Sequence, residues 1–549
     1  MLDRLLNGFK EKAGRLAYTS RLYNWTLDWP ISGQAGPELH MTPVDPWPGQ
    51  TGRGRWLCQG AVIFDNDSMP LEGNYWASQE ASQSLLDHLH SFEWLRDLKS
   101  YGGETARKQG RDMIFHWIDH HPAWSERSCQ PALLGRRVAN WLAMFEFYGA
   151  NMEDTERARI LNSLLRQVRH LSRSMASENP AGIDLLYAAK GLVYAGLCFQ
   201  GREAWLEQGL DFVEQDIPEQ VLSDGGHVTR CPVNTLMALK ICFEINSALA
   251  RGGYQRLEVL QHAIDRLTPA VRFFRHGDKR FCDFHMGTGE SEQEIDAVLS
   301  QVDGKIRIPK SLGHSGYERA TAGRSILIMD TGVAAERPHD RFAHASPLAF
   351  EFSHGRERIF VNCGTHRTDP AWAELLRSSA AHNMLVLNDR NAFEIRADGH
   401  IGKRVGEIDI ERFDAKGGMI IDASHTGYER ASGLVHRRRV FLSQNGCDLR
   451  GEDTLEGMLT PGKQADVAIR FHLHPRVLVS VIQEGRECLL RTHSGNGWRF
   501  YHVGGDLRLE NSVYLGEDGQ IRKTKQIVLR SLIDEAPVML QWALQKESA

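Results

Sequence analysis

The chain has 549 residues, which is too long for a single hydrophobic core, so we expect roughly two to four domains. Its hydrophobic content of 42% and charged content of 25% are those of an ordinary globular protein. The formal net charge of -5 gives no reason to expect nucleic-acid binding, and no Lys/Arg-rich run is longer than His436–Arg439. A local basic cleft could still bind an acidic polymer.

The cysteines and the N-terminal residues bear on the cellular compartment in which the protein is expected. The nine cysteines are scattered singly, which argues against a disulfide framework and against a zinc site of the CxxC type. Residues 1–9 lack the apolar core and cleavage site of a signal peptide, and no apolar run is long enough to span a bilayer. We therefore expect a cytoplasmic protein without a membrane span. The periplasm or cell envelope is the alternative.

The first half of the chain shows helical periodicity. Residues 1–80 look irregular, but from about residue 83 apolar residues recur at spacings of three and four, as in Leu85, Leu89, Phe92 and Leu95. Similar runs continue to about residue 275. This pattern predicts an all-α domain over residues 1–280.

After Phe281 the period changes to two. Leu348, Phe350 and Phe352 alternate with Ala349 and Glu351, and short strand-like runs separated by Gly, Asn and Asp turns follow almost to the end. This pattern predicts a large antiparallel β-sandwich over residues 281–549. Helices first and strands second give a multidomain α+β fold rather than an alternating α/β fold.

The stretch Ser223–Pro232, which reads SDGGHVTRCP, concentrates the features of a functional site. Paired glycines allow close approach to a ligand, and His227 is of a type that titrates near neutral pH. Arg230 could hold a carboxylate through two parallel donors. The alternative is a Gly-rich turn that caps a helix.

This stretch and three sequences in the second half resemble the heparinase II/III-like family of polysaccharide lyases. The three sequences are Ala343–Glu351, Val361–Thr365 and Arg377–Asn383, in the order in which the family has them. The resemblance implies an incomplete (α/α) toroid followed by a β-sandwich, with a sugar-binding cleft where they meet. It also implies β-elimination of glycans that contain uronic acid.

Elimination requires a group that neutralises the uronate, a base that removes the C5 proton and an acid that protonates the leaving oxygen. His227 is the best catalytic candidate and Arg230 the best carboxylate clamp. The tyrosine and histidine that active relatives have after the Gly-Gly-His sequence are replaced by Asn234 and Thr235. The asparagine of an earlier Gly-Asn-His-type sequence is also missing, because Gly182-Ile183-Asp184 stands there.

Two tyrosines could replace the missing phenol. Tyr317 and Tyr428 each follow a histidine across a short glycine turn, in His314-Ser-Gly-Tyr317 and His425-Thr-Gly-Tyr428. The hypothesis is that one of them points into the cleft and supplies the base. Packing at a strand end is the alternative for both.

Other residues are expected to bind substrate or metal. The candidates for substrate binding are Asp224, Asn234, Trp76 and Asn383, with Trp76 expected as a stacking platform in a loop. The family resemblance places His344, Asn362 and His382 at the metal site of some relatives. Asparagine is a weaker ligand than aspartate, so we expect no required cofactor, with a structural zinc ion in the β-sandwich as a possibility.

The leading hypothesis is therefore a lyase that cleaves an acidic polysaccharide or oligosaccharide by β-elimination. The alternative is a catalytically weakened family member that binds acidic glycan or a cell-envelope polysaccharide. Glycoside hydrolysis would require two carboxylates that flank one bond, and only Asp184 and Asp224 stand out for that role.

Overall fold

A computed structural model describes residues 18–28 and 38–547, apart from residues 122, 288, 289, 303, 305, 342, 403, 405–407, 460, 461, 463 and 518. The chain forms two compact units. The helical unit comprises Met1–Gln220 and Met237–Ile264, and the sheet unit comprises Val221–Leu236 and Asp265–Ala549. The residues that suggested a cytoplasmic location lie outside the described part.

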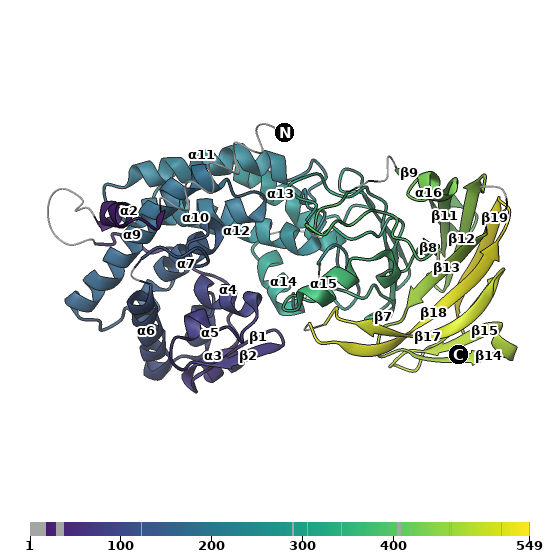
Figure 1. Ribbon diagram of the computed structural model, residues 1–549, viewed down its shortest axis with the longest axis horizontal. Helices are drawn as coiled ribbons and strands as arrows, with labels where there is room; N and C mark the ends of the chain where they lie inside the picture. Colours follow the sequence, from purple (N-terminus) through teal and green to yellow (C-terminus); the bar gives the residue numbers. More distant parts are fainter. Residues whose placement is uncertain are drawn as a thin grey trace. The chain divides into compact units, whose positions relative to one another are not determined.

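The helical unit consists almost entirely of helices (Figure 1). In chain order its elements are α2 (Arg21–Asp28), α3 (Thr51–Cys58), β1 (Ala61–Phe64), β2 (Asp67–Pro70), η1 (Tyr75–Ala77), α4 (Gln83–Ser91), α5 (Leu95–Tyr101), α6 (Gly103–His120), α7 (Pro131–Ala143), α8 (Phe145–Tyr148), α9 (Asp154–Glu178), α10 (Ile183–Cys198), α11 (Glu203–Gln220), most of α12 (Pro232–Arg251) and the first part of α13 (Glu258–Phe273). The hairpin of β1 and β2 lies in the segment that looked irregular in the sequence.

Helix α10 packs against both α7 and α11. Small residues allow α7 and α10 to approach closely, since a Cβ atom on Gly135 would lie 2.4 Å from the carbonyl oxygen of Tyr187. The helical spacing that Leu89, Phe92 and Leu95 show in the sequence is interrupted at Phe92, which has a left-handed φ of 59° and ends α4. The buried Phe92 ring stacks on Trp76, so tertiary packing overrides the local helical period.

The sheet unit carries the remaining elements. They are α14 (Glu292–Leu299), β3 (Ser311–Leu312), β4 (Tyr317–Ala322), β5 (Ser325–Asp330), β6 (Phe350–His354), β7 (Glu357–Phe360), α15 (Pro370–Leu376), η2 (Ser379–Ala381), β8 (Leu385–Leu387), β9 (Ile408–Ala415), β10 (Gly418–His425), α16 (Glu429–Ser432), β11 (Leu434–Ser443), β12 (Asp448–Gly457), β13 (Ala465–His472), β14 (Leu478–Ile482), η3 (Gln483–Gly485), β15 (Glu487–Arg491), β16 (Gly497–Val503), β17 (Asp506–Tyr514), β18 (Arg522–Ile533) and β19 (Val538–Lys546).

The strands of this unit form three antiparallel sheets within the described residues. The largest has the order β14-β15-β16-β19-β12-β11-β10-β9, and the others have the orders β17-β18-β13-β8 and β3-β4-β5-β6-β7. Aromatic side chains join the sheets, because Phe350 of β6 stacks on Trp542 of β19 with ring centroids 5.4 Å apart. Helices followed by antiparallel sheets confirm the predicted α+β fold class.

The basic run His436–Arg439 lies in β11, where side chains alternate between the two faces of the sheet. Arg437 and Arg439 point outward, and both bind Asp422 of the neighbouring β10. Arg438 points inward and is fully buried; its Nε donates to Asp453 at 2.7 Å. Each guanidinium of the run therefore has a carboxylate partner within the sheet unit.

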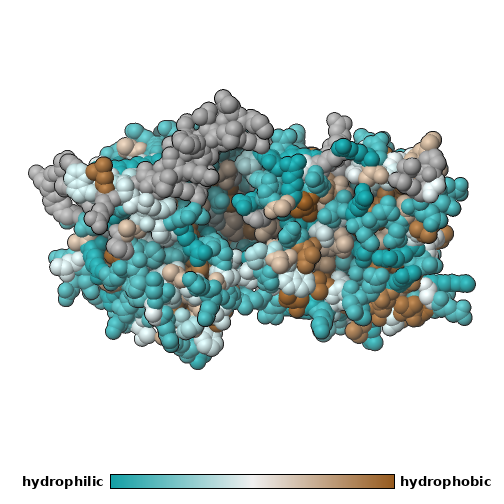
Figure 2. Space-filling view, in the orientation of Figure 1, coloured by the Kyte–Doolittle hydropathy of each residue, from teal (hydrophilic) through white to brown (hydrophobic). Residues whose placement is uncertain are grey.

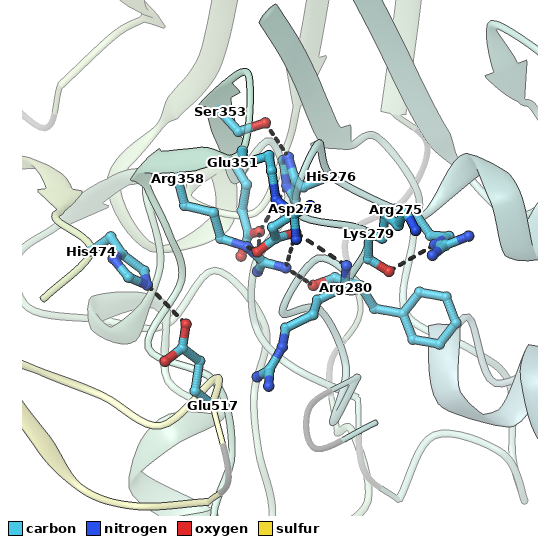
Figure 3. Close-up of polar contacts among 12 residues, drawn as sticks. Arg275, His276, Asp278, Lys279, Arg280, Glu351, Ser353, Arg358, His474 and Glu517 are labelled. Carbon is cyan, nitrogen blue, oxygen red and sulfur yellow. Dashed lines mark hydrogen bonds and ion pairs between the residues drawn. The ribbon is translucent and has the colours of Figure 1, made fainter. Parts of the chain in front are cut away.

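The division between the units differs from the predicted boundary at residue 281. The segment after α13 is held to strands β6 and β7 by buried ionic contacts (Figure 3). His276 lies between Ser353 and Glu351, and Arg358 donates to Asp278 at 2.9 Å. These contacts assign the last part of α13 to the sheet unit, although its sequence is helical.

We predict that Arg438→Met lowers the free energy of unfolding by about 3–5 kcal/mol, because it leaves the buried carboxylate of Asp453 without its cation. Arg437→Met on the same strand is the matched control, and its effect should stay below about 1 kcal/mol because its side chain is 40% exposed. Urea denaturation measures both values. Equal losses in the two variants would contradict the assignment of Arg438 to the core.

Candidate functional site

The Gly-Gly-His stretch joins α11 to α12 and belongs to the sheet unit. The amide of Leu222 donates to the carbonyl of Gly226, and Gly225 adopts a φ of 88°. A Cβ atom on Gly225 would lie 1.9 Å from the carbonyl oxygen of Arg266, and one on Gly226 would lie 1.9 Å from Ser315 Oγ. The glycines are therefore required by packing within the unit.

Asp224 connects this turn to the loop before β4. Its Oδ1 accepts hydrogen bonds from the amide of Gly226 at 3.0 Å and from Ser315 Oγ at 2.7 Å. Its Oδ2 accepts from the amide of Ser315 at 2.6 Å. Both carboxylate oxygens are thus used within the protein, which gives Asp224 a structural role rather than the expected role in substrate binding.

His227 is fully buried. Its Nδ1 accepts a hydrogen bond from the amide of Thr229 at 3.2 Å and lies 2.8 Å from Thr229 Oγ1. Burial lowers the pKa of His227 to about 3, so the imidazole is neutral at physiological pH. A neutral, enclosed imidazole of such low basicity is a poor proton acceptor, contrary to the catalytic role expected for it.

Arg230 has no donor left for a substrate carboxylate. The guanidinium has five N–H groups, and its side chain is only 6% exposed. The five acceptors are the backbone oxygens of Ser315 (2.7 Å), Gly316 (3.1 Å), Gly332 (3.2 Å) and Val333 (2.9 Å) and the Oδ1 atom of Asp330. The carboxylate clamp expected from the sequence is instead an anchor for the Gly-Gly-His stretch.

Both candidate tyrosines are buried and hydrogen-bonded to the backbone. The hydroxyl of Tyr317 donates to the carbonyl of Arg230 at 2.7 Å, and that of Tyr428 donates to the carbonyl of Leu385 at 2.9 Å. Burial raises the pKa of each phenol well above its ordinary value. The hypothesis that one of them serves as the catalytic base is therefore not supported, and both pack as the alternative reading expected.

The three residues expected at a metal site use their donor atoms on one another and on the backbone. His344 Nδ1 lies 2.9 Å from His382 Nε2, and His382 Nδ1 donates to the carbonyl of Ser378 at 2.8 Å. His344 Nε2 accepts from the amide of Met286 at 3.2 Å. Asn362 adds only a neutral amide, and no group of three His, Cys, Asp or Glu within the described residues could hold a metal ion. This arrangement does not fit zinc.

Asp330, at the end of β5, lies at the centre of this polar cluster. It binds Arg230, accepts from Ser346 Oγ at 3.1 Å and lies 3.1 Å from His285 Nε2. His285 Nδ1 in turn accepts from the amide of His344 at 3.0 Å. Burial opposes ionisation of Asp330, but Arg230 and His285 outweigh it and lower its pKa to about 2. The only sequence signal for Asp330 is an acidic residue that ends an apolar strand.

Asn383 and Asn234, two further candidates for substrate binding, differ in how deeply they are buried. Asn383 is fully buried; its Nδ2 donates to the carbonyl of Phe350 at 2.8 Å and its Oδ1 accepts from the amide of His472 at 2.6 Å. Asn234 is partly exposed and donates to Thr229 Oγ1 at 3.0 Å. Asn383 therefore joins strands and offers nothing to a sugar, whereas Asn234 remains accessible.

Trp76 belongs to the core of the helical unit. It is 1% exposed, and its ring stacks on Phe92 with centroids 5.4 Å apart. Its Nε1 donates to His116 Nδ1 at 2.8 Å. The expected platform for sugar stacking is thus a core residue, because the short helix η1 turns it inward.

Comparison with known families agrees with the two-unit architecture. The family profile described as Heparinase II/III N-terminus matches residues 75–270, and the one described as Heparinase II/III-like, C-terminal matches residues 306–543. The chain belongs to the heparinase II/III-like family.

One relative of this chain is FtsZ-localized protein C of Caulobacter vibrioides. The two are 31% identical over 526 residues, which cover 92% of this chain and 90% of the relative. A crystal structure of heparinase III has a TM-score of 0.73 at 13% identity and covers 98% of this chain and 91% of that one. A mutant of heparan sulfate lyase HepC from Pedobacter heparinus has a TM-score of 0.63 at 13% identity, over 100% of this chain and 88% of that chain. At such identities the two structures support the fold alone.

The helical unit of this heparinase II/III-like chain carries its own accessible polar cluster. Arg136 of α7 binds Glu93 through two contacts, at 2.8 and 3.3 Å, and its guanidinium lies 5.0 Å from the ring centroid of Tyr187. Asp184, at the position of the missing asparagine, is exposed on the first turn of α10. We name Glu93, Arg136, Asp184 and Tyr187 the Arg136 cluster.

Among the described helices, none is long and apolar enough to cross a membrane.

We predict that the free energy of unfolding falls as the pH decreases from about 6.5 to 3, in part because of His227. The unfolded chain binds a proton near pH 6.5, whereas the folded chain resists it down to pH 3, so protonation favours unfolding in this range. His227→Gln should reduce the slope by up to about 1.4 kcal/mol per pH unit. The exposed His314→Gln is the control for replacing a histidine by glutamine elsewhere in the sheet unit. An unchanged slope in His227→Gln would contradict the burial of a neutral imidazole.

Proposed function

We propose that this chain binds a glycan of the cell envelope and does not cleave it by β-elimination. One observation carries the proposal: the four side chains expected to perform the chemistry are already engaged within the sheet unit. These side chains are His227, Arg230, Tyr317 and Tyr428.

Each chemical requirement of elimination lacks a suitable group among these candidates. The donors of Arg230 are occupied by five acceptors, so it adds nothing to a uronate carboxylate. The phenols of Tyr317 and Tyr428 are buried with raised pKa values, and a base needs a pKa near the working pH. A glycan held by this protein would therefore keep its C5 proton.

Binding has chemical support in the Arg136 cluster. The contact with Glu93 holds the guanidinium of Arg136 in place, and both side chains are about a quarter exposed. A partly exposed arginine suits a sugar carboxylate, and the exposed carboxylate of Asp184 suits sugar hydroxyls. The cluster has the polar groups that a glycan with acidic and neutral sugars needs.

We predict that the purified protein binds at least one acidic envelope polysaccharide and forms no ultraviolet-absorbing unsaturated uronate from it. Arg136→Gln should weaken binding about tenfold, because a charge-assisted hydrogen bond contributes about 1.5 kcal/mol. Titration calorimetry measures the affinity, and ultraviolet absorbance of the same mixtures measures elimination.

The matched control is Arg159→Gln, on the exposed side of α9, which should bind like the unchanged protein. New ultraviolet absorbance would overturn the proposal in favour of a lyase. New reducing ends without absorbance would indicate hydrolysis. Equal weakening by both variants would remove the Arg136 cluster as the binding surface.

The relationship to FtsZ-localized protein C supports a second candidate function. Because the similarity extends over 92% of this chain, both units are included in it. We infer that this chain also localises with FtsZ.

We predict that a fluorescent fusion of the full chain colocalises with FtsZ in dividing cells of its own species. The Arg136→Gln fusion should localise equally well, because glycan binding and localisation are separate properties in this proposal. A diffuse fusion protein that still binds glycan in vitro would reject localisation with FtsZ and leave the glycan-binding proposal intact.

A further inference from the structure

Strand β14 forms one margin of the largest sheet (Figure 1). In the described part of the chain it pairs with β15 on one side and with no strand on the other. A strand in this position presents a row of unpaired N–H and C=O groups, which can pair with another extended segment. Its sequence is Leu478-Val-Ser-Val-Ile482, with no charged residue.

The opposite margin of the same sheet is built differently. Strand β9 carries four charged residues, Asp409, Glu411, Arg412 and Asp414. Strand β17, at the margin of the four-stranded sheet, also carries charges, at Asp506, Arg508 and Glu510. Charges on an edge strand oppose pairing with another chain. Strand β14 lacks this protection.

The side chains of β14 also remain open to solvent. Leu478 is 70% exposed and Val481 is 43% exposed. The space-filling view shows apolar side chains gathered on the part of the sheet unit that carries β14, β15 and β17 (Figure 2). β-Branched and apolar side chains favour strand pairing, and pairing would bury this apolar surface.

The charges that flank β14 are arranged symmetrically about its central residue, Ser480. Arg476 precedes Ser480 by four residues and Glu484 follows it by four residues. Both side chains are exposed, and Arg476 Nη2 lies 3.9 Å from Glu517 Oε2. A cation thus lies in the turn before β14, and an anion lies in the short helix η3 that follows it.

We propose that β14 pairs antiparallel with β14 of a second copy of this chain, with the twofold axis at Ser480. This register places Leu478 opposite Ile482 of the second copy, and Val479 opposite Val481 of the second copy. It also brings Arg476 toward Glu484 of the second copy, and the symmetry repeats this ion pair at the other end. The interface is isologous, since one strand meets itself.

Charge complementarity selects a second copy over an unrelated peptide as the partner. In the antiparallel register the opposite charges meet, whereas a parallel alignment of two β14 strands would place Arg476 beside Arg476 and Glu484 beside Glu484. The pairing would join two eight-stranded sheets into one continuous sheet across the dimer. It uses neither the Arg136 cluster nor the Gly-Gly-His stretch, so it stands apart from the glycan-binding proposal.

The test is the mass of the full-length protein in solution, by light scattering after size exclusion and by sedimentation equilibrium. We expect a dimer of the 62.0 kDa chain. Ser480→Lys places two like charges directly opposite each other at the axis, which should raise the dissociation constant about fivefold or more. Ile410→Lys, on the charged β9 margin, is the matched control and should remain dimeric.

A charge exchange keeps the test decisive if Ser480→Lys proves unstable. Arg476→Glu and Glu484→Arg should each weaken the dimer, because each places like charges at both ends. The double variant R476E/E484R should restore it. A monomeric unchanged protein, a dimer unaffected by Ser480→Lys in folded protein, loss of the dimer in Ile410→Lys, or failure of the double variant to restore the dimer would each overturn the proposal.

Discussion

The contact between Arg230 and Asp330 determines how the most distinctive segment of this chain is used. A buried ion pair is costly to desolvate, and it persists only when further hydrogen bonds satisfy the remaining donors. Four backbone carbonyls do this for Arg230, so the guanidinium is fixed in one orientation. The Gly-Gly-His stretch is thereby held to the sheet unit. All five N–H donors of Arg230 thus serve to anchor this stretch.

The same carboxylate orders the histidines beyond it. Asp330 orients His285, the amide of His344 binds His285, and His344 meets His382. Each contact fixes which nitrogen carries the proton, so the imidazoles act as neutral links in a hydrogen-bonded chain. Asn362 stands at the position where a charged ligand would be needed. The cluster thus balances one buried carboxylate with one buried guanidinium.

Periodicity predicted the helices and strands because each element needs only its own apolar face to be recognised. It could not predict the roles of Arg230, Tyr317 and Trp76, because their partners are distant in the sequence. The local sequence around a tyrosine that follows a glycine turn is the same whether its hydroxyl faces solvent or a backbone carbonyl. The predicted boundary between the two units differs from the observed division for a related reason. The period changes at residue 281, but the contacts of His276 with Ser353 and Glu351 bind the preceding helix to the sheets.

Because α12 and α13 are each divided between the two units, the order of synthesis affects how the protein folds. Arg230 emerges from the ribosome 100 residues before Asp330. At a synthesis rate of about 5–20 residues per second, Asp330 is made roughly 5–20 s after Arg230. During that interval the helical unit can pack, but the segment between α11 and α12 has no sheet to bind. The Gly-Gly-His turn therefore reaches its final contacts only after β5 has been synthesised.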